Sequence, residues 1–286
     1  MTGAAVLIIA DIRKGPPMAG ICIVVLDHRN DSYLRDLVDG IRTFCPDADL
    51  AWYNSGTEPV APGTPAATLS VLPNSRPLRY AKVTPFYFDL FEWAAGQDYD
   101  YVVNAETDMA FIRPGYERFL ASYMRGADYL SPGFESDIPD DIPWRAYRTL
   151  VPELPELLSI LGVERLNRGF SPGQVFSARY IHTLLDSPRY GDLRAFVDRN
   201  QEPGRSRTLQ EILLPTLPDA LGLTIREDPP HLRFFNRFRP YHKEATVRRA
   251  LATEDVYFVH PVYRHADDGA RQAVRRLLPR HGQRAA

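Results

Sequence analysis

Apolar residues follow two patterns along the first part of the chain, one typical of buried strands and one of helices. The run Ile21-Cys22-Ile23-Val24-Val25-Leu26 is apolar throughout and rich in β-branched side chains, as expected for a parallel strand that is covered on both faces. The next apolar residues have helical spacing: Leu34, Leu37, Val38 and Ile41. Strand, polar loop and amphipathic helix together predict the first unit of an α/β fold.

The alternation of strands and helices continues further along the chain. Strands are expected at residues 50–53, 67–72 and 101–103, and helices over residues 84–96 and 116–124. Such an alternation predicts a mostly parallel twisted sheet flanked by helices. The stretch 131–155 is rich in proline and aspartate and predicts a long surface loop.

The composition is that of an ordinary globular protein. The 286 residues are 44% hydrophobic, enough for one large core or a main lobe with a smaller appendage. A net charge of −2 gives no general attraction to nucleic acid, so a nucleic-acid partner is not expected. Two cysteines, Cys22 and Cys45, cannot form a disulfide framework, which favours the cytoplasm. No stretch approaches the ~20 apolar residues that span a bilayer, so no transmembrane segment is expected.

The acidic triplet Glu106-Thr107-Asp108 carries the clearest chemical signal. Two carboxylates separated by one residue project to the same side of an extended backbone, where they can share a hard divalent cation. Mg²⁺ or Mn²⁺ held there would bridge the two phosphates of a nucleotide sugar and neutralise the departing diphosphate. A solvated turn is the alternative interpretation of such a pair.

The segment from Tyr99 to Gly115 resembles the D-x-D segment of GT-A glycosyltransferases. In that superfamily a strand delivers two acids, a short apolar stretch follows, and an Arg-Pro-Gly turn opens the next helix. The matching pieces are Tyr99-Asp100-Tyr101-Val102-Val103, Glu106-Thr107-Asp108 and Phe111-Ile112-Arg113-Pro114-Gly115. Glu106 stands where the family has its first Asp, which leaves metal use open, because some branches of the superfamily use basic side chains instead.

The resemblance implies a GT-A (Rossmann-like) fold with a C-terminal extension. Its layout extends over residues 18–265, which are expected to form a single glycosyltransferase domain. Residues 1–17 would be a flexible leader, and residues 266–286 a C-terminal basic helix or tail. Three further places agree in order with the superfamily: Asp27-His28 after the first strand, residues 169–176, and Glu211.

The resemblance also implies roles for individual residues. Asp27 and His28 would line the nucleoside pocket, and Asn104, Glu106, Asp108 and Lys82 would bind the donor. The metal, Mn²⁺ or Mg²⁺, would be held by Asp108, Glu106 and His260, with His265 as a competing choice for the histidine. An imidazole ligand favours manganese over magnesium. A purely structural histidine is the alternative for His260.

Glu211 matches by position the carboxylate that deprotonates the acceptor hydroxyl in inverting members of the superfamily. The sequence Thr208-Leu209-Gln210-Glu211 is also a capping box, in which the glutamate only reaches back to the amide of the cap residue. Both interpretations stay open. In a retaining enzyme Glu211 would not have the role of base.

These residues together predict a glycosyltransferase. It would move a hexosyl or pentosyl group from a UDP- or GDP-linked sugar to a hydroxyl of a glycan or small molecule. One alternative is a nucleotidyltransferase, although the glycine-rich phosphate loop of such enzymes is missing after Leu26. The other alternative is a noncatalytic protein that binds nucleotide or sugar on the same fold.

Overall fold

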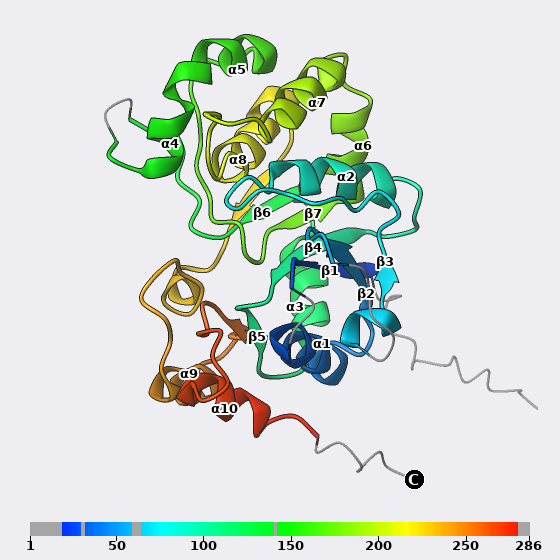
Figure 1. Cartoon of the computed structure of the whole chain (residues 1–286), viewed down its shortest axis with the longest axis vertical. Coiled ribbons are helices and arrows are strands. Elements are labelled where there is room, and N and C mark those ends of the chain that lie inside the picture. The colour runs from blue at the N-terminus through cyan, green and yellow to red at the C-terminus, as the bar shows by residue number, and fades with distance from the viewer. Residues whose placement is uncertain (1–18, 30–31, 59–63, 140–141, 280–286) are drawn as a thin grey trace, which may run out of the picture.

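The computed structural model describes residues 19–29, 32–58, 64–139 and 142–279. The expected leader, residues 1–17, lies outside the described residues, as do residues 280–286 of the expected tail. A seven-stranded sheet forms the centre of the molecule, with the strand order β3-β2-β1-β4-β7-β6-β8 (Figure 1). The strands are β1 (Ile21–Asp27), β2 (Asp49–Asn54), β3 (Ser70–Val71), β4 (Tyr101–Glu106), β6 (Tyr129–Ser131), β7 (Val175–Ser177) and β8 (Ile225–Glu227).

Most neighbouring strands in this sheet are parallel. Strand β7 is antiparallel to both of its neighbours, β4 and β6, and the remaining pairs run parallel. The mostly parallel sheet flanked by helices confirms the expected fold class. Of the expected strands, the one at 67–72 is shorter than predicted, because only Ser70 and Val71 pair with β2 and a 3₁₀ turn (Pro65–Thr68) comes before them.

Helices cover both faces of the sheet (Figure 1). Helices α2 (Thr84–Ala94), α6 (Ala178–Leu185), α7 (Tyr190–Arg199) and α8 (Gln210–Leu221) lie on one face, and α1 (Ser32–Phe44) and α3 (Tyr116–Tyr123) lie on the other. Strand β1 is buried on both sides, since Cys22, Val24 and Leu26 pack with the first group and Ile21, Ile23 and Val25 with the second. This double coverage explains its continuous apolar run.

The prediction of a long surface loop over residues 131–155 is wrong for its second half. The chain becomes helical there, in α4 (Arg145–Leu150), a 3₁₀ turn (Val151–Glu153) and α5 (Leu154–Leu161). Ala146, Tyr147 and Leu150 of α4 are buried in the main core. Their helical spacing and the apolar surface that they bury outweigh the local abundance of proline and aspartate.

The C-terminal part packs beside the carboxyl end of β4 and forms a hydrophobic cluster of its own. It contains a 3₁₀ helix η3 (Pro230–Phe234), α9 (Glu244–Ala252), β9 (Phe258–Val259) and α10 (Gly269–Arg275). Strand β9 pairs antiparallel with β5 (Ala110–Phe111), which follows the acidic triplet. This pairing brings the residues after β9 to the triplet. Among the described residues, no helix has the length and apolar character needed to cross a membrane.

Candidate functional site

The acidic triplet lies at the carboxyl end of β4, next to the carboxyl end of β1. Leu26 of β1 is in register with Glu106, so Asp27 and the triplet occupy the same edge of the sheet. The backbone is extended only as far as Glu106, and a turn follows, in which the amide of Met109 donates to the carbonyl of Glu106 at 2.8 Å. The spacing alone suggested that both acids lie on one extended strand. In the structure only Glu106 does so, and Asp108 lies in the turn.

Two basic side chains from the C-terminal part contact the carboxylate of Asp108. Its Oδ1 lies 3.3 Å from Nε2 of His260 and 3.2 Å from Nη2 of Arg264. The Arg264 contact is an ion pair, neither contact has hydrogen-bond geometry, and this Oδ1 is buried without a hydrogen bond. Burial on its own would raise the pKa of Asp108, but His260 and Arg264 outweigh it and lower the pKa to about 2.

His260 is held in a fixed orientation at the end of β9. Its Nδ1 lies 3.0 Å from the carbonyl oxygen of Arg237, so its Nε2 is the nitrogen that faces Asp108. The amide of Val262 donates to the carbonyl of Asp108 at 2.8 Å and joins the two segments directly. His265, the competing candidate, is exposed and stacks on Tyr263 at a ring distance of 6.1 Å.

Glu106 and Glu211 are two acids near enough to affect each other's charge. Glu211 lies in the first turn of α8. Burial and then the nearby Glu106 raise the pKa of Glu211 to about 8, and burial and then Asp108 raise the pKa of Glu106. The carboxyl of Glu211 has no hydrogen bond from any other residue of the described chain. It is therefore protonated at low pH and available to exchange a proton near neutral pH.

The capping-box interpretation of Glu211 is wrong. The amide of Thr208, which the glutamate would have to bind, donates to the carbonyl of Ala81 at 2.7 Å. The hydroxyl of Thr208 bonds to the carbonyl of Arg207 at 2.7 Å, and the residue before the helix is Leu209, which provides no side-chain cap. Tertiary contacts at Thr208 have replaced the local motif, and the carboxyl of Glu211 is left for another role.

Asn104, which was expected to bind the donor, makes its side-chain contacts inside the fold. The residue is completely buried. Its Nδ2 donates to the hydroxyl of Tyr87 at 2.8 Å and to the carbonyl of Ser171 at 3.0 Å, and its carbonyl accepts from the amide of Gly173. Asn104 therefore positions the loop Ser171–Gln174 beside the site.

Lys82 is also in a different place from the one expected for a donor-binding residue. Its Nζ donates to the carbonyls of Asn200 and Glu202, at 2.8 and 2.5 Å, in the segment that follows α7. The residue is buried. The cation beside the acids is Arg264 instead. The sequence signal for Arg264 is weak, since arginine is common in this chain and only its position four residues after His260 sets it apart.

Asp27 and His28 follow β1 at the same sheet edge. Asp27 is buried and its Oδ2 accepts from the amide of Arg29 at 3.0 Å, whereas His28 is exposed. The loop after β2 packs tightly on them, because a Cβ on Gly56 would come within 2.3 Å of the carbonyl oxygen of His28. Only glycine permits that approach, which keeps the carboxyl ends of β1 and β2 close together.

Only part of the expected metal-ligand set comes together. Asp108 and His260 form a pair with the donor atoms Oδ1 and Nε2, and the buried Oδ1 without a hydrogen bond is an oxygen that a cation could take. Within the described ranges there is no cluster of three or more His, Cys, Asp or Glu side chains arranged to hold a metal ion. A cation bound by this pair would take its remaining ligands from the substrate, as Mg²⁺ and Mn²⁺ do with phosphates.

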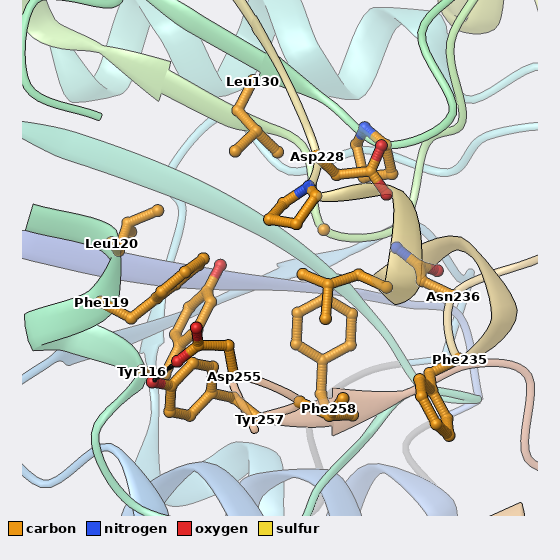
Figure 2. Close-up of a pocket in the computed structure, with 15 residues that line it drawn as sticks. Tyr116, Phe119, Leu120, Leu130, Asp228, Phe235, Asn236, Asp255, Tyr257 and Phe258 are labelled. Carbon is orange, nitrogen blue, oxygen red and sulfur yellow. Dashed lines mark hydrogen bonds between the residues drawn. The ribbon is translucent and has the colours of Figure 1, made fainter. Parts of the chain in front are cut away.

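A separate apolar cavity of about 40 Å³ lies between α3, η3 and β9 (Figure 2). Its walls include Phe119, Leu232, Tyr257 and Phe258. Gly173, in the stretch 169–176, lines it, but none of the residues expected to bind the metal or the donor or to act as base does so. A space of this size holds only a few water-sized groups, so it does not compete with the acidic cluster as a nucleotide site.

The comparisons with known proteins are structural. No family model matches the chain, and no curated protein matches its sequence. The similar solved structures include the galactosyltransferase LgtC in complex with donor and acceptor sugar analogs, at 12% identity and a TM-score of 0.45, covering 91% of this chain and 98% of that one. The mannosyltransferase Ktr4p from S. cerevisiae matches at 13% identity and a TM-score of 0.40, covering 75% of this chain and 70% of that one.

A third similar structure is Core-mannan synthase A from Aspergillus fumigatus in an Mn/GDP form. It matches at 13% identity and a TM-score of 0.38, covering 73% of this chain and 72% of that one. All three names are those of sugar-transferring enzymes. Since the identities and TM-scores are low, what this chain does has to be argued from its own residues.

Proposed function

We propose that this chain is a glycosyltransferase of the GT-A kind, which moves a sugar from a UDP- or GDP-linked donor to a hydroxyl of a glycan or small molecule. One observation supports the proposal: at the carboxyl edge of the sheet, His260 and Arg264 contact the carboxylate of Asp108. Glu106 interacts electrostatically with Asp108, and Glu211 with Glu106. Ligands of open α/β sheets bind at this edge.

The basic side chains beside Asp108 fit a diphosphate. Arg264 presents a guanidinium whose side chain is 32% exposed, and guanidinium groups bind phosphate oxygens in pairs of hydrogen bonds. The imidazole Nε2 of His260 contacts the same carboxylate, that of Asp108. A donor diphosphate would take Arg264 as its counter-ion in place of Asp108, and this exchange would leave Asp108 free for a cation.

Mn²⁺ or Mg²⁺ would be held by Asp108 and His260, with Glu106 close by. When bound, such an ion neutralises the charge that develops on the leaving diphosphate. Arg264 would supply positive charge to the same oxygens. Arg264 and a metal ion would thus have overlapping roles. Such an overlap agrees with Glu106 in place of the first Asp of D-x-D, which leaves metal use open.

Glu211 would act as the general base in an inverting reaction. A base is most effective when its pKa lies near the working pH, and the pKa of Glu211 is raised to about 8. Its carboxyl is not used by the capping box or by any other hydrogen bond in the described part of the chain. It can therefore take the proton of an acceptor hydroxyl as the sugar is transferred.

Calorimetric titration of UDP and GDP, with and without Mn²⁺, tests this proposal. We expect the wild type to bind one of the two nucleotides. The Asp108→Asn and Arg264→Gln variants should each bind it at least tenfold more weakly. Glu254→Gln, at an exposed residue away from the cluster, serves as the control and should bind like the wild type. Failure of both nucleotides to bind the wild type would contradict the proposal.

Slow hydrolysis of UDP- and GDP-sugars then separates the remaining alternatives. Release of free sugar by the wild type supports a transferase. Nucleotide binding without any hydrolysis or transfer supports the noncatalytic alternative, and formation of a nucleotide sugar with release of pyrophosphate from UTP or GTP supports the nucleotidyltransferase.

A further inference from the structure

Exposed aromatic rings gather on the segment that runs beside His260. Phe238 is 70% exposed, Tyr263 46% and Phe234 41%. We call Phe238, Arg239, Tyr241 and Tyr263 the aromatic–arginine strip. Grouped exposed rings of this kind mark binding surfaces more often than isolated exposed residues do.

The side chains of the strip are held in place by one another. The guanidinium of Arg239 lies 3.9 Å from the ring centre of Tyr241 and 5.1 Å from that of Phe238. The rings of Tyr241 and Tyr263 are 4.8 Å apart. Cation–π and ring contacts reduce the freedom of these side chains before any ligand binds, so the strip is a preformed surface.

Positive charge without an ion-pair partner lies on the strip and on residues near it in the sequence. Arg237, Arg239, Lys243 and Arg249 form no ion pair with any carboxylate in the described part of the chain, although the whole chain has a net charge of −2. Arg237 and Arg249 lie instead over the ring of Phe234, at 5.1 and 4.7 Å. A local group of unpaired guanidinium and ammonium groups favours an anionic partner.

The strip is continuous with the candidate site. The amide of Arg237 donates to the carbonyl of His260 at 3.1 Å, and the amide of His242 donates to the carbonyl of Pro261 at 2.9 Å. Tyr263 precedes Arg264, whose guanidinium contacts Asp108. A ligand on the strip would therefore lie beside the carboxylate cluster, where an acceptor has to be.

We propose that the aromatic–arginine strip binds an acidic saccharide, the acceptor of the proposed transferase. Sugar rings have apolar C–H faces that pack on aromatic rings, and a sugar carboxylate or sulfate would bind the guanidinium of Arg239. Interfacial membrane binding typically uses the continuous apolar face of an amphipathic helix, whereas here the rings alternate with arginine on a non-helical segment. The role of the saccharide as acceptor rests on the proposed function, whereas its binding to the strip does not.

Binding of fluorescently labelled saccharides to the full chain tests the strip. The probes are an oligogalacturonate, a sulfated oligosaccharide and a neutral maltooligosaccharide of the same length. We expect saturable binding of at least one acidic probe, at least tenfold tighter than that of the neutral one. Arg239→Gln and Phe238→Ala should each weaken it tenfold or more. Arg226→Gln is the matched control, since Arg226 lies over Tyr123 at 5.3 Å in a cation–π pair elsewhere on the surface.

Three results would overturn the inference: no saturable binding of either acidic probe, equal loss of binding in the Arg226 control, or binding only to vesicles of phosphatidylglycerol. Acidic-saccharide binding in a chain that binds neither UDP nor GDP would support the strip and contradict the proposed function. Nucleotide binding without saccharide binding would support the proposed function and overturn the strip.

Discussion

Two groups of carboxylates in this molecule show how burial leads to different outcomes. Asp89 in α2 is 2% exposed, and both of its oxygens are bound: Arg194 donates to Oδ1 at 2.6 Å, and Arg76 and Tyr53 donate to Oδ2 at 3.0 and 2.6 Å. Glu211, in the first turn of α8, has no such partner, and the charge of another acid, Glu106, acts on it.

The difference separates structural from chemical roles. A buried charge that is paired on both oxygens joins elements of the fold, and here it ties α2 to α7 and to β2. When a carboxyl lies near another acid with no cation beside it, ionisation of that carboxyl destabilises the folded state. Such arrangements are found mainly at functional sites. Changes at the two places should therefore have opposite effects on stability and activity.

The largest expected effect is on activity at Glu211. Glu211→Gln should lower kcat for sugar transfer by about 10²–10⁴-fold, the usual contribution of a general base, without lowering the melting temperature. Rates with and without acceptor and a thermal melt measure both. Glu254→Gln should change neither quantity. A Gln variant with nearly full transfer activity would contradict the role of base and favour a retaining reaction.

The next effect is on stability at Asp89. Asp89→Ala should lower the free energy of unfolding by about 1–3 kcal/mol, because the buried hydroxyl of Tyr53 loses its acceptor. Arg194 and Arg76 keep a second carboxylate, that of Asp198, which limits the loss. Urea unfolding at pH 7 measures the loss. Replacement of exposed Asp186 by Ala is a suitable control. A loss no larger than that of the control would show that the network around Asp89 adds little to stability.

The smallest effect is the pH dependence of stability. The pKa of Glu211 rises from its ordinary value of 4.5 to about 8 in the folded chain, so the folded state binds its proton more tightly than the unfolded state. The contribution to stability is therefore full below about pH 4.5 and is lost as the pH rises towards 8. Glu211→Gln should remove this loss, so that its melting temperature exceeds that of the wild type by a few degrees at pH 8 and less at pH 5. Equal differences at the two pH values would contradict the raised pKa.

The sequence alone was sufficient for the local features of the molecule. The unbroken apolar run from Ile21 to Leu26 predicts a buried parallel strand, and the structure covers β1 on both faces. The position of Glu106 at the end of a buried strand was also predictable, although the strand is longer than the expected 101–103. Both follow from interactions between residues close in the chain, or from the simple burial of a face, and such interactions leave a periodic pattern.

The partners of each polar group were decided only by the tertiary structure. Arg264 contacts Asp108, which is 156 positions earlier in the sequence. The ammonium group of Lys82 donates to two carbonyls that follow α7. The amide of Thr208 donates to the carbonyl of Ala81 and does not take part in a capping box. A side chain forms the best contact that packing brings within reach, and no local pattern records which distant segment that will be.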